Sequence, residues 1–345
     1  MAPPVRWGIV GCGRISHDFV SAMASLPSAS LHACAARSLA NAQAFATTHK
    51  IPLAYGSYEQ LCADTAVDVV YVGTQHITHF HAAMLALSYG KHVVVEKPMM
   101  MNASQVQQCV ALAREKKCVL VEAVWTRFFP ALAFVRTLLQ EKRIGEVRNV
   151  HAHMGVAFPT SVASVWSRAM GGGGLNCIGI YPLTFATLAL GTEPVKVTAT
   201  GGLTPDGVDA YSTVTLEYSG QRFATVEYTL LANMGAAVTL VGTLGRIEIH
   251  DPAYAPTKVS LTLFKEPRIV ETSVFPLPPR AADAVYNFST SEGLVYEAAA
   301  ITNAVQNQQT EMDEYPLDEA IGVATLMQEI RRQVGVKYDS DEPSA

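Results

Sequence analysis

One stretch near the N-terminus decides the fold: Val5-Arg6-Trp7-Gly8-Ile9-Val10-Gly11-Cys12-Gly13-Arg14-Ile15-Ser16. A short apolar strand runs directly into the pattern Gly-x-Gly-x-x-Ser, and a helix follows. Gly11 permits the tight turn, Gly13 lets the backbone approach a pyrophosphate, and Ser16 stands where a third glycine is usual. The first amides of the helix would then face the phosphates. The stretch therefore predicts a dinucleotide-binding turn, with Gly11, Gly13, Arg14 and Ile15 against the cofactor.

Strands and helices alternate through the first third of the chain. We expect strands at residues 5–10, 31–36, 51–55, 68–73, 93–96 and 118–123, with helices between them. Such alternation predicts an α/β fold in which residues 1–124 form a doubly wound parallel sheet of the Rossmann type.

The pattern changes after residue 124. We expect a helix at 131–141, an inserted helix at 177–189 and strands at 147–155, 195–201, 211–218, 221–230, 236–241, 246–250, 259–264 and 269–274. Residues 125–338 are therefore predicted to form an α+β domain on a large, mostly antiparallel open sheet. The helix at about 317–334 could also pack back on the first domain. We expect the acidic tail, 339–345, to be disordered.

Composition narrows the classes of protein and partner. A chain of 345 residues favours two domains, and a net charge of −5 without a basic run argues against nucleic acid. Glycines, prolines and asparagines interrupt the two uncharged windows, 171–192 and 228–245, so we expect no membrane span. We expect no signal peptide, because a cationic segment and a cleavage site are not evident before the first strand. Six scattered cysteines are typical of a reduced cytoplasmic protein. The partner we expect is a small-molecule substrate.

The end of the second predicted strand indicates which dinucleotide is bound. An NAD-preferring site of this kind has an acidic residue there for the ribose 2′-hydroxyl. This chain has Arg37-Ser38 instead, and a guanidinium suits a 2′-phosphate. We therefore predict NADP(H), bound by Arg37 and Ser38; a surface arginine on a turn is the alternative.

Further polar residues follow the other strands at the same edge of the sheet. Thr74, Gln75, His76 and His79 come after the strand at 68–73, and Glu96-Lys97-Pro98 ends the strand at 93–96. In an open parallel sheet the carboxyl edge lines the ligand crevice, so we expect these residues to contact the cofactor. Lys97 is also a candidate for binding the substrate. The alternative is that Lys97 is a solvated lysine in a turn.

Taken together, these motifs resemble the Gfo/Idh/MocA family of nicotinamide-dependent oxidoreductases over nearly the whole chain. Within it, the similarity is greatest to the dihydrodiol and NADP-dependent D-xylose dehydrogenase branches. The stretches that carry the resemblance are Arg6-Trp7-Gly8-Ile9-Val10, Tyr55-Gly56-Ser57-Tyr58, Gly73-Thr74-Gln75-His76, Glu96-Lys97-Pro98, Trp125-Thr126-Arg127-Phe128-Phe129-Pro130 and Ile178-Gly179-Ile180-Tyr181.

The resemblance implies a catalytic pair, Lys97 and Tyr181, at a domain junction. It also implies a cis peptide bond before Pro98 and a homodimer formed through the second sheet. Because a tyrosine is a weak base at neutral pH, with an ordinary pKa of about 10, a nearby ammonium that favours the phenolate would be useful. We therefore assign Tyr181 as general acid/base and Lys97 as its electrostatic partner. Trp166 and Arg168 are further candidates for the cofactor, although Arg168 could equally be a surface residue.

One position departs from the family pattern. The aspartate usual just after the glycine run is Cys177 here, and a thiol cannot accept sugar hydroxyls as a carboxylate does. This puts sugar binding in doubt more than hydride transfer. The predicted substrate residues, beside Lys97, are Trp125, Arg127, Phe128, Phe158, Cys177 and Tyr181, with simple core packing as the alternative for the aromatic ones.

Two functions remain open from sequence. The first is an NADP-dependent dehydrogenase acting on a carbinol of a trans-dihydrodiol or an aldose such as D-xylose. The second is a catalytically impaired NADP-binding regulator or partner, which Cys177 alone favours. No metal is expected, because the His79/His81 and His151/His153 pairs lack a matching acid-rich partner.

Overall fold

The computed structural model describes residues 3–280 and 284–341, and these group into two compact units. Unit 1 holds the described residues of 1–100, 104–128 and 277–317; unit 2 holds those of 101–103, 129–276 and 318–345. The segment 277–317, which the sequence division left in the second domain, thus groups with the first unit. The helix after it groups with unit 2.

Unit 1 is built on a six-stranded parallel sheet of order β3-β2-β1-β4-β5-β6. Its strands are β1 (Val5–Val10), β2 (Ala29–Ala35), β3 (Leu53–Tyr55), β4 (Val69–Val72), β5 (His92–Glu96) and β6 (Leu120–Ala123). All four residues of β4 and four of the five in β5 are buried, as expected of a parallel sheet with helices on both faces. The order reverses between β1 and β4, so the predicted Rossmann sheet is confirmed.

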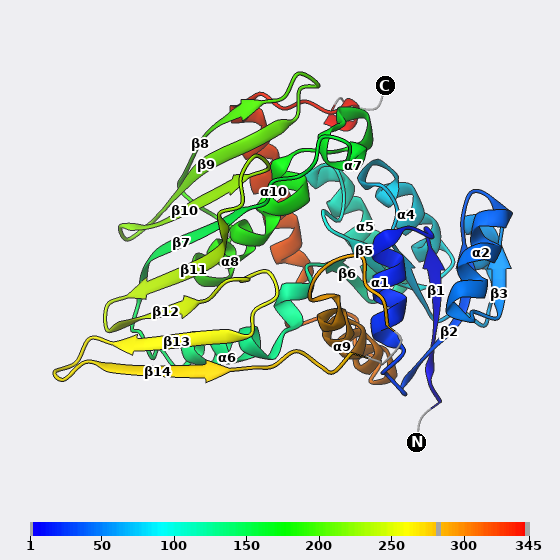
Figure 1. Cartoon of the computed structure of the whole chain (residues 1–345), viewed down its shortest axis with the longest axis horizontal. Coiled ribbons are helices and arrows are strands. Elements are labelled where there is room, and N and C mark those ends of the chain that lie inside the picture. The colour runs from blue at the N-terminus through cyan, green and yellow to red at the C-terminus, as the bar shows by residue number, and fades with distance from the viewer. Residues whose placement is uncertain (1–2, 281–283, 342–345) are drawn as a thin grey trace. The chain divides into compact units, whose positions relative to one another are not determined.

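The helices of unit 1 follow the strands as the pattern predicts (Figure 1). They are α1 (Arg14–Met23), α2 (Leu39–His49), α3 (Tyr58–Ala63), η1 (His76–Thr78), α4 (His79–Ser88), α5 (Ala103–Lys116), η2 (Trp125–Phe128), η5 (Ser291–Gly293) and α9 (Leu294–Gln306). The α9 helix packs on α1 and η2, so a late segment of the chain completes the first unit.

Unit 2 is built on an eight-stranded sheet of order β14-β13-β12-β11-β7-β10-β9-β8, antiparallel except for the β7–β10 pair. Its strands are β7 (Val147–Gly155), β8 (Lys196–Leu203), β9 (Asp209–Tyr218), β10 (Arg222–Thr229), β11 (Gly235–Gly242), β12 (Gly245–Ile249), β13 (Lys258–Leu263) and β14 (Ile269–Val274). Burial alternates along β9 and β11, so one face is packed and the other is accessible. The predicted large, mostly antiparallel sheet is confirmed.

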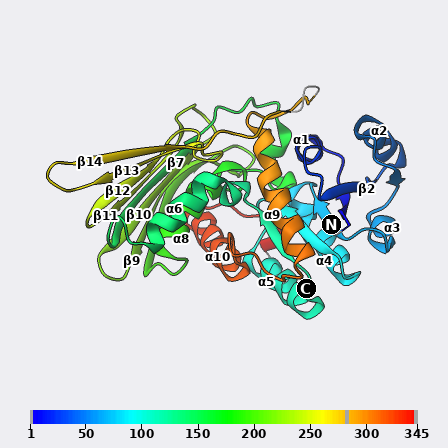
Figure 2. The same cartoon turned by 90° about the horizontal axis from the view of Figure 1, so that it is seen from below.

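Helices cover one face of this sheet (Figure 2). The helical elements of unit 2 are α6 (Pro130–Gln140), α7 (Ala163–Trp166), η3 (Arg168–Met170), a π-helical turn η4 (Leu175–Gly179), α8 (Ile180–Leu190), α10 (Leu317–Val334) and η6 (Asp339–Asp341). The α8 helix packs on β7 and β10. The helical stretch Arg168–Leu190 is long and apolar enough to cross a membrane, but 78% of its most apolar window is buried inside the protein, as in a core helix.

The end of the chain differs in part from expectation. We predicted disorder for 339–345, whereas Asp339–Asp341 form η6, and the Tyr338 amide donates to the Asp341 carboxylate at 3.0 Å. Residues 342–345 lie outside the described residues.

Candidate active site

The turn after β1 has the geometry that a dinucleotide-binding turn requires. Gly11 has φ +90°, and a Cβ there would lie 2.7 Å from the Gly73 carbonyl oxygen, so both conformation and space demand glycine. A Cβ on Gly13 would meet only that oxygen, at 3.8 Å, which leaves open space in front of this backbone. Ser16 is fully buried and its hydroxyl donates to Gly73 at 3.4 Å, which supports its reading as the close-packing third residue.

The N-terminus of α1 fits an anion. Gly13 is the N-cap residue, no side chain caps the helix, and the first turn contains no acidic residue. The first residues of the helix, Arg14 and Ile15, therefore place backbone amides and one guanidinium where a pyrophosphate would bind. These features of the described residues suit a dinucleotide, as the sequence predicts.

Arg37 and Ser38 follow the carboxyl end of β2, the strand that pairs with β1, at the same edge of the sheet. Arg37 is exposed, and Ser38 is the N-cap of α2 without a side-chain cap hydrogen bond. The pKa of Tyr58 is raised by burial, and the nearby positive charge of Arg37 offsets part of this increase. No acidic residue follows β2 directly in the sequence, and the binding of a 2′-phosphate by Arg37 and Ser38 stays a prediction.

The turn after β5 is held by a buried histidine. The Lys97–Pro98 bond is cis, as the resemblance implies. His79 is fully buried, with Nδ1 2.9 Å from the Pro98 carbonyl oxygen and Nε2 3.2 Å from that of Thr74. Burial lowers the pKa of His79. Its ring therefore links two loops at the sheet edge, and this geometry makes it a positioning residue instead of the direct cofactor ligand we predicted.

The other residues of the loop after β4 are more accessible. Gln75 is exposed and is the N-cap of η1, while Thr74 and His76 are partly buried. The Thr78 hydroxyl donates to the Thr74 hydroxyl at 2.9 Å, and the His76 ring lies edge-on to that of His79. Thr74, Gln75 and His76 thus stay at the edge where the sequence places them.

Glu96, Glu122 and Glu297 are three of the buried glutamates among the described residues of unit 1. Glu96 accepts a hydrogen bond from the Tyr71 hydroxyl at 2.6 Å, and its carboxyl faces the interior, not the crevice as we predicted. Glu122 accepts one from the Met99 amide at 2.7 Å, and burial raises its pKa to about 7. Burial, together with the charge of Glu96, raises the pKa of Glu297 well above its ordinary value. Sequence reasoning did not single out Glu122 and Glu297, although a glutamate inside an apolar strand is a usable signal.

The predicted pocket residues of unit 1 are largely buried. Trp125 and Phe128 are each 8% exposed in η2, and Arg127 is 2% exposed with its guanidinium over the Tyr315 ring at 4.9 Å. Arg127 is therefore packed inside the unit and supports η2 instead of presenting its charge to a substrate. Trp125 and Phe128 keep a small accessible edge.

In unit 2 the glycine run lets η4 lie directly on the sheet. Cβ atoms on Gly174 and Gly179 would lie 2.8 Å and 2.7 Å from the Tyr228 ring. Asp209 in β9 accepts a hydrogen bond from the Leu175 amide at 2.7 Å, and burial raises the pKa of Asp209 to about 6. This buried carboxyl at the start of η4 was not anticipated from sequence.

Cys177 lies within η4, where it is 9% exposed. The neighbouring Asn176 is turned inward, and its amide donates to the Gly171 carbonyl at 3.1 Å and to the Tyr338 hydroxyl at 3.2 Å. These hydrogen bonds attach the Asn176 side chain to the glycine run and to Tyr338. Asn176 does not replace the missing aspartate.

The remaining predicted residues of unit 2 are half-buried or exposed. Tyr181 is half-buried in the first turn of α8, with its ring 6.2 Å from that of Tyr254, and Phe158 is half-buried after β7. Trp166 donates to the Pro159 carbonyl at 2.9 Å, and the Arg168 guanidinium pairs with Asp339 at 3.5 Å. Both candidates for the cofactor therefore have partners within their own unit.

Comparison with known proteins agrees with these features. Residues 5–124 match the "Oxidoreductase family, NAD-binding Rossmann fold" model, and residues 132–248 match the "GFO/IDH/MocA C-terminal domain" model. The protein is similar to trans-1,2-dihydrobenzene-1,2-diol dehydrogenase of Danio rerio, at 40% identity, and of Bos taurus, at 38%. Each match covers 98% of this chain and 99% of the relative.

A solved structure shares the whole fold. Levoglucosan dehydrogenase in complex with NADH and levoglucosan superposes with a TM-score of 0.84 at 19% identity, covering 96% of this chain and 97% of that one. At this identity the likeness concerns the fold alone. The two family models and the full-length relatives show that the chain is an oxidoreductase and belongs to the Gfo/Idh/MocA family.

Proposed function

We propose that the protein is an NADP-dependent dehydrogenase that oxidises a carbinol of a trans-dihydrodiol or of an aldose such as D-xylose. The observation that carries the substrate class is the full-length similarity, at 36–40% identity, to relatives named trans-1,2-dihydrobenzene-1,2-diol dehydrogenase. The preference for NADP is supported by Arg37 at the end of β2, in the place of an acidic residue.

Lys97 and Tyr181 act as the catalytic pair in this proposal. The turn at Gly11, Gly13 and Arg14 would hold the dinucleotide, which would supply the hydride acceptor for the carbinol carbon. The Tyr181 phenolate takes the proton of the same hydroxyl group, and the Lys97 ammonium binds the substrate oxygen and favours the phenolate. Carbon loses a hydride and oxygen loses a proton, so the product is a carbonyl compound.

The buried groups near each catalytic residue hold it in place. His79 links the Pro98 and Thr74 carbonyls, so the backbone that carries Lys97 is supported from the interior. Asp209 and the glycine run hold η4, from which α8 and Tyr181 continue. We assign Trp125, Phe128 and Phe158 as apolar walls for the substrate. The thiol of Cys177 offers no acceptor comparable to a carboxylate, which favours the less polar dihydrodiol over an aldose.

The test is a screen at the absorbance band of reduced nicotinamide, with a trans-dihydrodiol and D-xylose as alcohols and a vicinal diketone for the reverse reaction. Each is measured with both dinucleotides. We expect turnover with NADP(H), and we expect Tyr181→Phe to abolish it across pH. Tyr89→Phe, which removes an exposed hydroxyl at the end of α4, is the matched control. Full turnover of Tyr181→Phe would contradict the assignment of the base.

A catalytically impaired NADP-binding regulator is the second candidate, and Cys177 is the observation that favours it. The same screen separates the two functions. Tight binding of NADPH without turnover on any of these substrates would support the regulator.

We also propose a homodimer formed through the accessible face of the unit 2 sheet. Tyr211 and Phe223 are 47% and 41% exposed there, and the His151 ring lies edge-on to Phe223. Phe223→Glu is expected to shift the molar mass measured by light scattering from dimer to monomer. We propose a cytoplasmic location as well, because six cysteines scattered along the chain are typical of proteins in a reducing compartment.

A further inference from the structure

A buried carboxylate lies one helical turn beyond the phosphate-binding turn of unit 1. Asp18 in α1 is fully buried, and its partners are neutral groups from one distant segment. The Asn287 amide donates to it at 2.8 and 3.0 Å, the Asn287 side chain at 2.9 Å, the Phe288 amide at 2.9 Å and the Ser291 hydroxyl at 2.7 Å. A buried charge is tolerated only with such hydrogen bonds, so Asp18 fixes this segment firmly on α1.

The segment 285–291, which we call the strap, runs beside α1 before it enters α9 (Figure 1, orange). A second contact ties it to the helix, because His17 Nε2 lies 2.9 Å from the Val285 carbonyl oxygen. Arg280 lies over the Tyr286 ring at 5.5 Å and pairs with Glu292 at 3.1 Å. The strap is therefore attached at several points within unit 1.

Asn287 also holds Arg14, the first residue of α1. The Arg14 Nε donates to the Asn287 side-chain oxygen at 3.4 Å, and its Nη2 donates to the Asn287 carbonyl oxygen at 3.3 Å. The Asn287 side chain in turn donates to the Arg14 carbonyl oxygen at 3.2 Å, and the guanidinium lies over the Phe288 ring at 4.8 Å. The strap therefore contacts both the guanidinium and the backbone carbonyl of Arg14.

A cation at this place needs an explanation. The N-terminus of a helix carries partial positive charge, so an arginine there is disfavoured by up to about 1 kcal/mol, and an anion bound beside it offsets this cost. The first turn of α1 has no acidic residue, and the contacts that hold Arg14 are to neutral groups of the strap. The guanidinium is therefore placed for an external anion.

We propose that Asp18 is a positioning residue for dinucleotide binding: it fixes the strap on α1, and Asn287 of the strap holds Arg14 toward the cofactor pyrophosphate. The inference rests on the proposed function, because it requires that a dinucleotide binds at Gly11 and Gly13. The pyrophosphate is common to NAD and NADP. The strap therefore acts on both dinucleotides equally, whereas Arg37 distinguishes them.

The test measures dissociation constants of NADPH and NADH by fluorescence titration. Asn287→Ala and Asp18→Asn are each expected to weaken binding of both dinucleotides about 10-fold, with unchanged turnover at saturating cofactor. Arg14→Ala should give a similar loss, and Asn287→Ala should add less than about 2-fold in the Arg14→Ala background, since its effect passes through Arg14.

Asp68→Asn is the matched control, because Asp68 accepts hydrogen bonds from Arg6 at the opposite edge of the same sheet. It should leave both dissociation constants unchanged. If Asp18→Asn does not fold, the exposed Asn287 decides the matter through its own variant and the double variant. Wild-type affinity in Asn287→Ala, or losses that multiply in the double variant, would overturn the inference. A wild-type protein that binds neither dinucleotide would instead refute the proposed function.

Discussion

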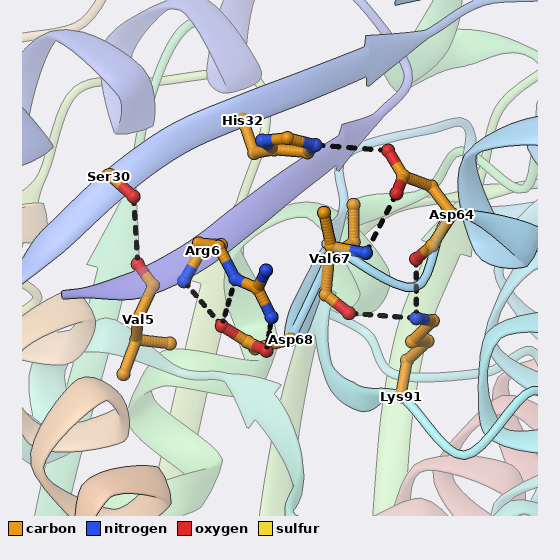
Figure 3. A network of polar contacts seen from close by, with 9 residues as sticks. Val5, Arg6, Ser30, His32, Asp64, Val67, Asp68 and Lys91 are labelled. Carbon is orange, nitrogen blue, oxygen red and sulfur yellow. Dashed lines mark hydrogen bonds and ion pairs between the residues drawn. The ribbon is translucent and has the colours of Figure 1, made fainter. Parts of the chain in front are cut away.

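The two edges of the parallel sheet in unit 1 use charged residues in opposite ways. At the amino edge, charges are paired (Figure 3): Arg6 donates to Asp68 at 2.7 Å, His32 lies 3.0 Å from Asp64, and Lys91 donates to the Asp64 and Val67 carbonyls at 2.7 and 2.8 Å. At the carboxyl edge, Arg14 and Arg37 are exposed beside a glycine turn, and buried glutamates lie behind Lys97. The charged groups of the amino edge have partners within unit 1, whereas the carboxyl edge is the one that we propose for the dinucleotide.

Strand β5 allows the two edges to be compared directly, because Lys91 precedes it at the amino edge and Lys97 follows it at the carboxyl edge. Lys97→Met should lower turnover about 1,000-fold through loss of its charge in the transition state. Lys91→Met should leave turnover unchanged and cost about 2 kcal/mol of stability, since two carbonyls lose their buried donor. Turnover and thermal melting of both variants check this. Equal activity losses in the two variants would break the distinction between the edges.

A variant of Glu122 measures how much the buried carboxylate behind the carboxyl edge destabilises the folded protein. Burial raises the pKa of Glu122 to about 7 from an ordinary value of 4.5, so the neutral form favours folding. The cost to the wild type appears as pH rises from 4.5 to about 7 and is complete above that range. Glu122→Gln should therefore gain about 3 kcal/mol at pH 8 and nothing at pH 4.5. Melting temperatures at both pH values measure this, with the exposed Glu146→Gln as control; a gain that is the same at both pH values would argue against a buried ionisation.

Arg37 tests the assignment of the ligand at this edge. Arg37→Ala removes charge-assisted hydrogen bonds to a 2′-phosphate, so KM for NADP should rise about 10- to 100-fold while KM for NAD changes little. Steady-state kinetics with both dinucleotides measure the difference, and Arg222→Ala in unit 2 controls for loss of a positive charge. An equal effect on the two dinucleotides would remove the argument for NADP.

The smallest effect is expected at the amino edge. Burial alone would raise the pKa of Asp68, but the hydrogen bonds from Arg6 outweigh it and lower that pKa. The pair therefore stabilises the protein above an ordinary pKa of 3.8, and this contribution is lost as pH falls below it. Because both side chains are partly exposed, Asp68→Asn should cost less than about 1 kcal/mol at pH 7. Denaturant unfolding measures the loss in free energy of unfolding. A loss of several kcal/mol would contradict the expectation that solvent screens this ion pair.

The elements of both sheets were predictable because their signals are local. Period-two burial in β11 and the buried runs of β4 and β5 follow directly from side-chain pattern, and β7 and β14 have the predicted bounds. The π-helical turn η4 was predicted only as part of a helix. Its extra residue per turn depends on Asp209 and Tyr228, which lie on strands that the local sequence does not contain.

By itself the sequence determined that Gly11 must turn the chain, that Lys97 ends a parallel strand and that Arg37 stands where an acid is usual. Each of these depends on backbone conformation or on position along one strand. Tertiary structure alone decided that Glu96 and His79 face the interior and that Asp18 holds Asn287. Residues 269 positions apart meet only when α1 and the segment before α9 pack together, and no periodicity in the chain records that contact.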